Sequence, residues 1–139
     1  MSDLEANRHA ASEFFRLIWN EKEESAIDRF IAVDVAGNDP KLGVGRKLFR
    51  KQWKEWHAAF PNLHFDVREI LCEGDRVVTC WHLSGTHSGA DFQGIKASGK
   101  SVSVDGVSID TIKDGVVLDG FDAWDSLGFR QQLGIIPRD

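Results

Sequence analysis

The hydrophobic pattern of the chain changes at Pro61, and this change constrains the fold more than any other feature of the sequence. Before Pro61, apolar residues recur at intervals of three and four, which is typical of helices that bury one face. After Pro61, apolar and polar residues alternate in segments that end at turn residues, which is typical of strands with one buried face. Helices followed by a run of strands predict an α+β domain.

Three helices and one short strand are expected before Pro61. The segments LEANRHAASEFFRLIWN and ESAIDRFIA carry the first two apolar stripes, and a third helix is expected to begin near Gly45. The segment between them, VDVAGNDPKLGVG, is expected to run from a strand into a loop. Four aromatic residues recur on the third helix at steps of four, three and four: Phe49, Trp53, Trp56 and Phe60. Their rings are therefore expected on one face, as the wall of a ligand cavity.

Four antiparallel strands, arranged as two hairpins, are expected after Pro61. The turn EGD joins LHFDVREIL to RVVTCWHLSGTH, and the turn KDG joins SVSVDGVSIDTI to VVLDGFDAW. A three-residue loop in the second hairpin would place Ser108 and Asp110 on the face of Asp122, whereas a two-residue Asp-Gly turn would place Val107 and Ile109 there. The sequence leaves both registers open.

Composition excludes several classes of function. The length of 139 residues predicts one domain, spanning residues 1–139, and the net charge of -5 disfavours nucleic acid as a partner. The only basic run, GRKLFRKQWK, has helical spacing and is expected to form a solvated helix face. Because no stretch approaches the ~18 apolar residues of a membrane span, we expect no membrane partner and a cytoplasmic location.

No metal or cofactor is expected from the sequence. The five histidines show no HxH or HxxxH spacing, and Cys72 and Cys80 do not form a CxxC pair.

The stretch LDGFDAWDSLGF carries two aspartates among apolar residues. Strand alternation places Asp122 on one face with Trp124, and Asp125 on the other. Asp125 precedes SLGFRQQLG and is expected to cap a helix or turn. Asp122, surrounded by aromatic residues, is expected to have a raised pKa, which suits a general acid/base. A structural role for Asp122, as a hydrogen-bonded carboxylate, stays open.

Several segments resemble the SnoaL-like polyketide cyclase family, one branch of the NTF2-like superfamily. These segments are EFFRLIWN, AAFPNLHFDV, EGDRVV, SGTHSGADFQGIKASGKSVSVDGVSI and AWDSLGFRQQLG, and the resemblance extends from about Ala6 to Gly134. It implies an α+β cone in which three N-terminal helices pack on a curved, mostly antiparallel sheet, and it implies a homodimer.

The resemblance also implies a reaction. Characterised cyclases of this group close a ring of an aromatic polyketide by an intramolecular aldol step, without metal or cofactor, using an aspartate whose matching position is Asp122. They tend to place a histidine on the neighbouring strand, where this chain has Ser103, Ser108 and Asp110. An oxyanion would therefore lose its imidazole partner. His82 is a candidate substitute, although alternation leaves open which of Trp81 and His82 points inward.

The leading hypothesis is a small cofactor-independent enzyme that acts on a hydrophobic, carbonyl-bearing molecule. Asp122 and His82 are the candidate catalytic residues. Candidate ligand-binding residues are Asn38, Trp53, Trp56, Phe60, Ser108, Asp110 and Trp124. One alternative is a non-catalytic binding protein. Another is an epoxide hydrolase or isomerase of the same fold, in which an arginine would have to bridge Asp110 and Asp122.

Overall fold

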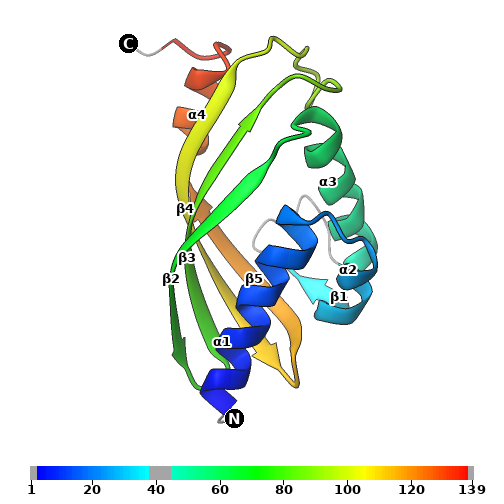
Figure 1. The fold of residues 1–139 in the computed structure, drawn as a ribbon, viewed down its shortest axis with the longest axis vertical. Coiled ribbons are helices and arrows are strands. Elements are labelled where there is room, and N and C mark those ends of the chain that lie inside the picture. The colour runs from blue at the N-terminus through cyan, green and yellow to red at the C-terminus, as the bar shows by residue number, and fades with distance from the viewer. Residues whose placement is uncertain (1–2, 38–44, 138–139) are drawn as a thin grey trace.

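The computed structural model describes residues 3–37 and 45–137 and has the predicted order of helices and strands. The helical segments are α1 (Asp3–Glu13), η1 (Phe14–Asn20), α2 (Ser25–Phe30), α3 (Arg46–Ala59) and α4 (Ser126–Gln132). The strands are β1 (Ile31–Ala36), β2 (His64–Glu73), β3 (Arg76–Thr86), β4 (Ser101–Lys113) and β5 (Val116–Trp124). Figure 1 shows α1, α2 and α3 together on one side of a curved sheet, so the predicted α+β fold is confirmed.

The sheet has the strand order β1-β5-β4-β3-β2. Strand β1 runs parallel to β5, and the other three pairs are antiparallel. The connectivity permits this parallel pair, because α3 and three further strands separate β1 from β5 in the chain. Strand β1 thus extends the sheet beneath the N-terminal end of α3.

The first helical stripe is not one continuous α-helix. After α1 the chain widens into the π-helical segment η1, so that the neighbouring residues Phe14 and Phe15 are both buried. A π-helical turn inserts one extra residue and rotates the side chains that follow it. It also turns Trp19 toward Phe49 of α3 and Phe65 of β2, with ring centroids 5.8 and 5.2 Å apart.

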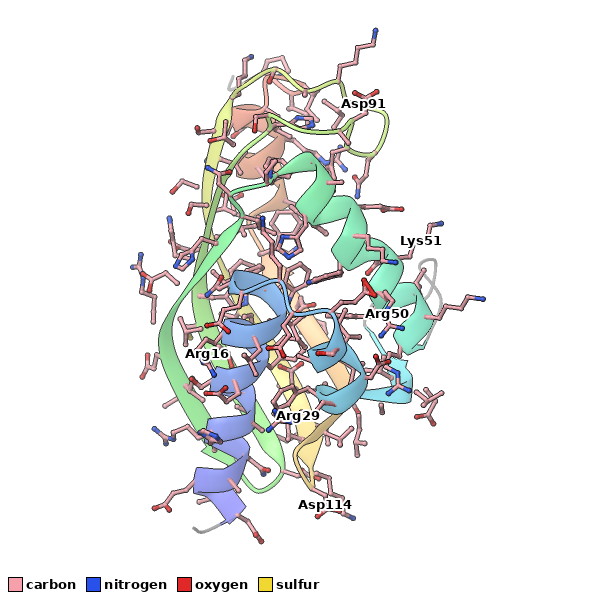
Figure 2. All side chains as sticks on the ribbon, turned by 45° about the vertical axis from the view of Figure 1, so that its right-hand side comes forward. Arg16, Arg29, Arg50, Lys51, Asp91 and Asp114 are labelled. Atoms are coloured by element: carbon pink, nitrogen blue, oxygen red, sulfur yellow. The ribbon has the colours of Figure 1, made fainter. Side chains whose placement is uncertain are left out.

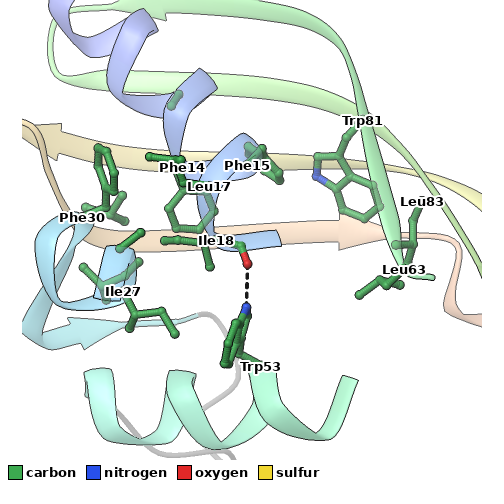
Figure 3. Packing of buried hydrophobic residues seen from close by; sticks show 14 of the residues in the cluster. Phe14, Phe15, Leu17, Ile18, Ile27, Phe30, Trp53, Leu63, Trp81 and Leu83 are labelled. Atoms are coloured by element: carbon green, nitrogen blue, oxygen red, sulfur yellow. Dashed lines mark hydrogen bonds between the residues drawn. The ribbon is translucent and has the colours of Figure 1, made fainter. Parts of the chain in front are cut away.

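The core lies between the helices and the inner face of the sheet (Figure 3). Ile18 and Ile27 are fully buried, and Trp53 from α3 closes over them. The Trp53 indole N–H donates a hydrogen bond of 2.7 Å to the carbonyl oxygen of Ile18, which satisfies the only polar atom of a buried ring.

The outward face of α3 is polar, as its sequence predicts. Lys51 and Lys54 are exposed, whereas Arg50 reaches back to Asp28 of α2 at 2.6 Å. Figure 2 shows Arg50 and Lys51 on the outer side of α3. The basic run therefore forms a solvent-exposed face of α3, and Arg50 links α3 to α2 by an ion pair.

The turn of the second hairpin has two residues, Asp114 and Gly115, both with positive φ. Lys113 therefore pairs with Val116, as a type I′ turn requires. Neither register considered from the sequence is correct over the whole hairpin, because a bulge interrupts the ladder beyond the turn.

The bulge lies at Leu118. Ile112 pairs with Val117, but Thr111 pairs with Asp119, so Leu118 has no partner on β4. One inserted residue shifts the register by one and changes which face each later residue occupies. As a result, the turn has two residues, yet Ser108 and Asp110 lie on the face of Asp122, as expected for the three-residue loop.

Helix α4 follows β5 directly. The Asp125 carboxylate accepts a hydrogen bond of 2.8 Å from the Gly128 backbone N–H, which confirms the predicted cap. Phe129 packs against Trp124 and Phe60, with ring centroids 5.3 and 5.8 Å apart. Helix α4 thus adds aromatic packing at the end of the cone. No helix within residues 3–37 and 45–137 is long and apolar enough to cross a membrane.

Candidate functional site

A cavity of about 510 Å³ lies between the inner face of the sheet and the helical segments η1 and α3. Aromatic rings from five elements line it, including those of Phe14, Trp19, Phe49, Trp56, Trp81 and Trp124. A cavity with aromatic walls and a few polar groups has the character of a small-molecule site. Three of its polar residues, Ser108, Asp110 and Asp122, form a group on β4 and β5, and Gln52 and Glu55 lie on α3.

Ser108 on β4 and Asp122 on β5 form the centre of this polar group. They are directly opposite each other in the ladder because of the bulge at Leu118. The Ser108 hydroxyl donates to Asp122 Oδ1 at 2.6 Å. Both residues line the cavity, and Asp122 is the more exposed of the two. The carboxyl group of Asp122 is therefore the more accessible group for a ligand in the cavity.

Trp81 on β3 fixes the direction of this hydrogen bond. Its indole N–H donates to Ser108 Oγ at 2.9 Å, and an indole nitrogen cannot accept. The Ser108 oxygen therefore accepts from Trp81, and its own hydrogen is directed to Asp122. The two successive hydrogen bonds, from Trp81 to Ser108 and from Ser108 to Asp122, thus supply a fixed donor to one carboxyl oxygen of Asp122.

Two opposing effects set the pKa of Asp122. Desolvation by the surrounding protein raises the pKa of this carboxyl above its ordinary value, and the hydrogen bond from Ser108 lowers it in part. The net direction is upward. This direction is the one that a carboxyl group needs to exchange protons near neutral pH.

Asp110 lies two residues along β4 from Ser108 and faces the same cavity. It is 7% exposed and pairs in the ladder with Gly120. Burial raises the pKa of Asp110 to about 8, and the nearby carboxylates of Asp122 and Asp119 act in the same direction. The β4–β5 side of the cavity therefore carries two carboxyl groups, of which Asp110 is the more deeply buried.

Two strand glycines make room for these side chains. A Cβ atom at Gly106 would overlap the ring of Trp81, and a Cβ atom at Gly120 would lie 2.6 Å from Asp110 Oδ1. Trp81, Gly106 and Gly120 were not among the site residues predicted from the sequence. Glycine inside a strand pattern, which often marks a close approach, is the signal that points to the last two.

Five of the residues predicted from the sequence lie around the cavity, namely Trp56, Ser108, Asp110, Asp122 and Trp124. They come from α3, β4 and β5. Ser108 and Asp110 lie on the face of Asp122 only because the bulge at Leu118 shifts the register of the hairpin by one residue.

Trp53 and Phe60 do not line the cavity, although both belong to the aromatic stripe of α3. Trp53 turns toward Ile18 instead. Phe60 lies beyond the last residue of α3, where its ring stacks on His87 at 5.0 Å. The helical stripe therefore divides into residues that build the core and residues, such as Phe49 and Trp56, that face the cavity.

His82 lies on the outer face of β3, because strand alternation directs Trp81 inward. Its ring nitrogens lie 2.7 Å from Asp105 Oδ1 and 2.6 Å from Ser103 Oγ, both on β4. It is thus on the opposite side of the sheet from Asp122, and its position does not support a role at the cavity. Asn38, the remaining predicted residue, lies outside the described residues.

No group of three or more His, Cys, Asp or Glu residues that could hold a metal ion occurs in the described part of the chain. The chemistry that this site offers comes from carboxyl and hydroxyl groups. The two cysteines are free and partly exposed, and neither lines the cavity.

The fold matches known structures. TsrD from Streptomyces laurentii superimposes with a TM-score of 0.87 at 25% identity, covering 98% of this chain and 100% of that one. A candidate polyketide cyclase from Acidithiobacillus ferrooxidans has a TM-score of 0.81 at 25% identity, covering 96% and 98% of the two chains. AclR, a proposed hydroxylase from Streptomyces galilaeus, has the same fold, with a TM-score of 0.84 at 23% identity and coverage of 99% and 86%.

No curated protein matches the chain. The family comparison, in contrast, matches SnoaL-like polyketide cyclase over residues 9–133, which includes every described residue that lines the cavity. Together with the NTF2-like cone seen in the structure, this match shows that the chain belongs to the SnoaL-like polyketide cyclase family.

Proposed function

We propose that this protein is a cofactor-independent enzyme that removes a proton next to a carbonyl group of a hydrophobic small molecule, with Asp122 as the general base. An aldol-type ring closure is the reaction of this class that the family description supports. The observation that carries the proposal is the position of Asp122, which is accessible from an aromatic cavity and receives a hydrogen bond from Ser108.

The Ser108 hydrogen bond suits a base that must also give its proton back. The Ser108 hydroxyl holds Oδ1 of Asp122 in place. The raised pKa of Asp122 makes it a stronger base than an ordinary carboxylate, and the Ser108 donor partly offsets the rise. General acid/base catalysis of this kind typically contributes about 10²–10⁴-fold in rate.

The walls of the cavity indicate the character of the substrate. Trp56 and Trp124 lie 6.1 Å apart between ring centroids and present their rings at 68°. With carboxyl groups as its most polar contacts, such a cavity favours a neutral, largely aromatic or polycyclic carbonyl compound over an anionic one.

An epoxide hydrolase of this fold would need an arginine between the two carboxyl groups. The sequence offers Arg68 and Arg76 as candidates, but Arg68 is exposed and pairs with Asp66 at 2.7 Å, and Arg76 is exposed at the start of β3. Neither lines the cavity. Proton abstraction is therefore the better-supported chemistry. The homodimer implied by the family resemblance stays a prediction.

Deuterium exchange into 2-tetralone, a hydrophobic ketone small enough for the cavity, tests the proposed function. The protein is incubated with the ketone in D₂O near pH 7, and loss of the α-proton signal is followed by NMR against a protein-free blank. We expect the wild-type protein to accelerate exchange and Asp122→Asn to lose about 10²-fold or more of that acceleration.

Asp105→Asn is the matched control, because it makes the same chemical change in a carboxyl group on the outer face of β4. It should exchange the ketone at the wild-type rate. Wild-type protein that binds 2-tetralone without accelerating exchange would favour the non-catalytic binding protein. Equal acceleration by Asp122→Asn and the wild type would show that Asp122 is not the base.

A further inference from the structure

The mechanism above leaves one buried titratable group of the cavity without a role. Asp110 lies on β4 two residues from Ser108, on the same face of the sheet, with its carboxyl group lining the cavity. Its ladder partner is Gly120, and Asp122 follows two residues later on β5. Asp110 and Asp122 are therefore diagonal neighbours across the ladder. At this separation, both side chains can contact one small ligand group.

The Asp110 carboxyl occupies space that a side chain at position 120 would fill. A Cβ atom there would lie 2.6 Å from Asp110 Oδ1, closer than such contacts occur in proteins. The Asp110 carboxyl thus lies against the backbone of β5, beside the strand that carries Asp122. The strand pair holds both acids against the same part of the cavity wall.

The two carboxyl groups differ in their donors. Asp122 accepts from Ser108, but no hydrogen bond from a described residue reaches the Asp110 carboxyl. An ionised carboxylate buried without a donor is strongly disfavoured, whereas a protonated one can itself donate. The surroundings therefore disfavour ionisation of Asp110 more than that of Asp122.

The charged groups around Asp110 strengthen this difference. Asp119 and Asp122 approach it from β5, and Glu55 of α3 lines the same cavity. None of the described lining residues is a lysine, arginine or histidine. Burial, together with the charges of Asp122 and Asp119, raises the pKa of Asp110 to about 8, so the group carries its proton at neutral pH.

We propose that Asp110 is a second catalytic residue, a neutral carboxylic acid that donates its proton to the oxygen of the carbonyl group while Asp122 removes the proton from the neighbouring carbon. This inference rests on the proposed function. It also assigns to Asp110 the task that the missing histidine on this strand would have performed.

The two carboxyl groups complete a cycle that needs no further reactant. The C–H bond breaks, its proton moves to Asp122, and its electron pair forms a C=C bond as the carbonyl oxygen takes the Asp110 proton. In ring closure, the enol carbon then attacks a second carbonyl carbon of the same molecule. The enol O–H returns its proton to Asp110 as the C=O bond re-forms, and the new alkoxide takes the proton held by Asp122. Both acids regain their starting states.

The protonation state of Asp110 is tested first, without substrate. The side-chain carboxyl carbons are labelled with ¹³C and titrated by NMR in the wild type, Asp110→Asn and Asp105→Asn. We expect one carboxyl signal to titrate near pH 8 in the wild type and in Asp105→Asn, and to be missing in Asp110→Asn. An Asp110 signal that titrates below pH 5 would overturn the proposal.

The role in catalysis is tested with 2-tetralone exchange as a function of pH. Removing one donor to a developing oxyanion typically costs about 10²–10³-fold, so Asp110→Ala should lose rate on this scale. Asp110→Asn keeps an N–H donor and should lose less. The wild-type rate should fall above about pH 8 as Asp110 ionises, and this alkaline limb should be absent from Asp110→Asn. A residue with a purely structural role would not remove the limb.

The outcomes separate the two proposals. If Asp122→Asn loses exchange while Asp110→Ala and Asp110→Asn keep the wild-type rate and the alkaline limb, the proposed function stands and the role of Asp110 is wrong. If the wild-type protein accelerates no exchange, the proposed function fails, and the catalytic role of Asp110 fails with it even where the NMR titration shows a neutral acid.

Discussion

Ser108 Oγ lies 2.6 Å from Asp122 Oδ1 across the β4–β5 ladder, and the indole N–H of Trp81 holds Ser108 in the orientation that donates to Asp122. This contact links a buried residue of β3 to the carboxyl group that a ligand would meet. It exists because a single bulge residue, Leu118, places Ser108 opposite Asp122.

Ser108→Ala should raise the pKa of Asp122, because the hydrogen bond that partly offsets desolvation is lost. The acid limb of the exchange profile with 2-tetralone should therefore move to higher pH. The change also leaves the buried Trp81 indole N–H without its acceptor, which should reduce the free energy of unfolding by about 1–3 kcal/mol.

Ser103→Ala is the control for this variant, since Ser103 is also on β4 but contacts His82 on the outer face. The pH profile and unfolding in urea are measured for both. An acid limb that stays at the wild-type pH in Ser108→Ala would show that the hydroxyl does not control Asp122.

Gly120→Ala should displace the Asp110 carboxyl, because the added Cβ atom would lie 2.6 Å from Oδ1. Overpacking of this kind typically costs about 1–3 kcal/mol. Asp110→Ala removes the obstructing group, so the double variant should be less destabilised than the sum of the two single variants. Urea unfolding of all four proteins completes this cycle, and strict additivity would contradict the contact.

The contribution of Asp110 to the stability of the wild type should fall as pH rises. An unfolded aspartate has a pKa of about 3.9, whereas the pKa of Asp110 is raised to about 8 in the folded protein. Between these values Asp110 binds more protons in the folded state than in the unfolded state, so its contribution to the free energy of unfolding decreases with pH and levels off above about 8.

Asp110→Asn removes this proton uptake. Its free energy of unfolding, measured in urea at pH 5 and pH 8, should therefore fall less from pH 5 to pH 8 than that of the wild type. Asp105→Asn, with an exposed carboxyl group, should keep the wild-type slope. If the free energy of unfolding of the wild type changed from pH 5 to pH 8 in the same way as that of Asp110→Asn, a raised pKa at Asp110 would be contradicted.

His57 on α3 offers a separate test of the core. Its ring lies near those of Trp19 and Trp53, at 5.7 and 5.1 Å between centroids, and neither ring nitrogen has a hydrogen-bond partner. Burial lowers the pKa of His57 to about 4, and Lys22 acts in the same direction. The unfolded state therefore binds more protons than the folded state between about pH 6.5 and pH 4.

His57→Phe should consequently be as stable as the wild type or more stable at pH 7, because it removes two buried nitrogens without partners and keeps an aromatic ring in place. On acidification from pH 7 to pH 4.5, the difference in stability between His57→Phe and the wild type should shift in favour of the variant. Thermal unfolding at both pH values measures this, with His64→Phe, an exposed position on β2, as the control. A large loss of stability in His57→Phe at pH 7 would indicate a polar partner for the ring.

The sequence determined the fold class because hydrophobic periodicity is a local property. The change of pattern at Pro61, the Asp-Gly turn and the residues after Asp125 each predict an element from neighbouring residues, and each element is present. The family resemblance added Asp122, whose place in a cavity is a result of the cone as a whole.

The sequence could not determine which residues of each pattern face the ligand. Trp53 and Trp56 are three residues apart on α3 and share one expected face. Trp53 nevertheless donates a hydrogen bond to Ile18 of η1, whereas Trp56 lines the cavity. The packing of η1 against α3 decides which ring joins the core and which ring lines the cavity. The inward position of Trp81 was likewise undecided until the sheet register was known.

What the sequence determined by itself is therefore the set of elements and the candidate acid Asp122. Only the tertiary structure placed Ser108 and Asp110 beside it, through a bulge at Leu118 that no composition or periodicity marks. The physical reason is that strand pairing has a period of two, so a single unpaired residue moves every later side chain to the other face of the sheet.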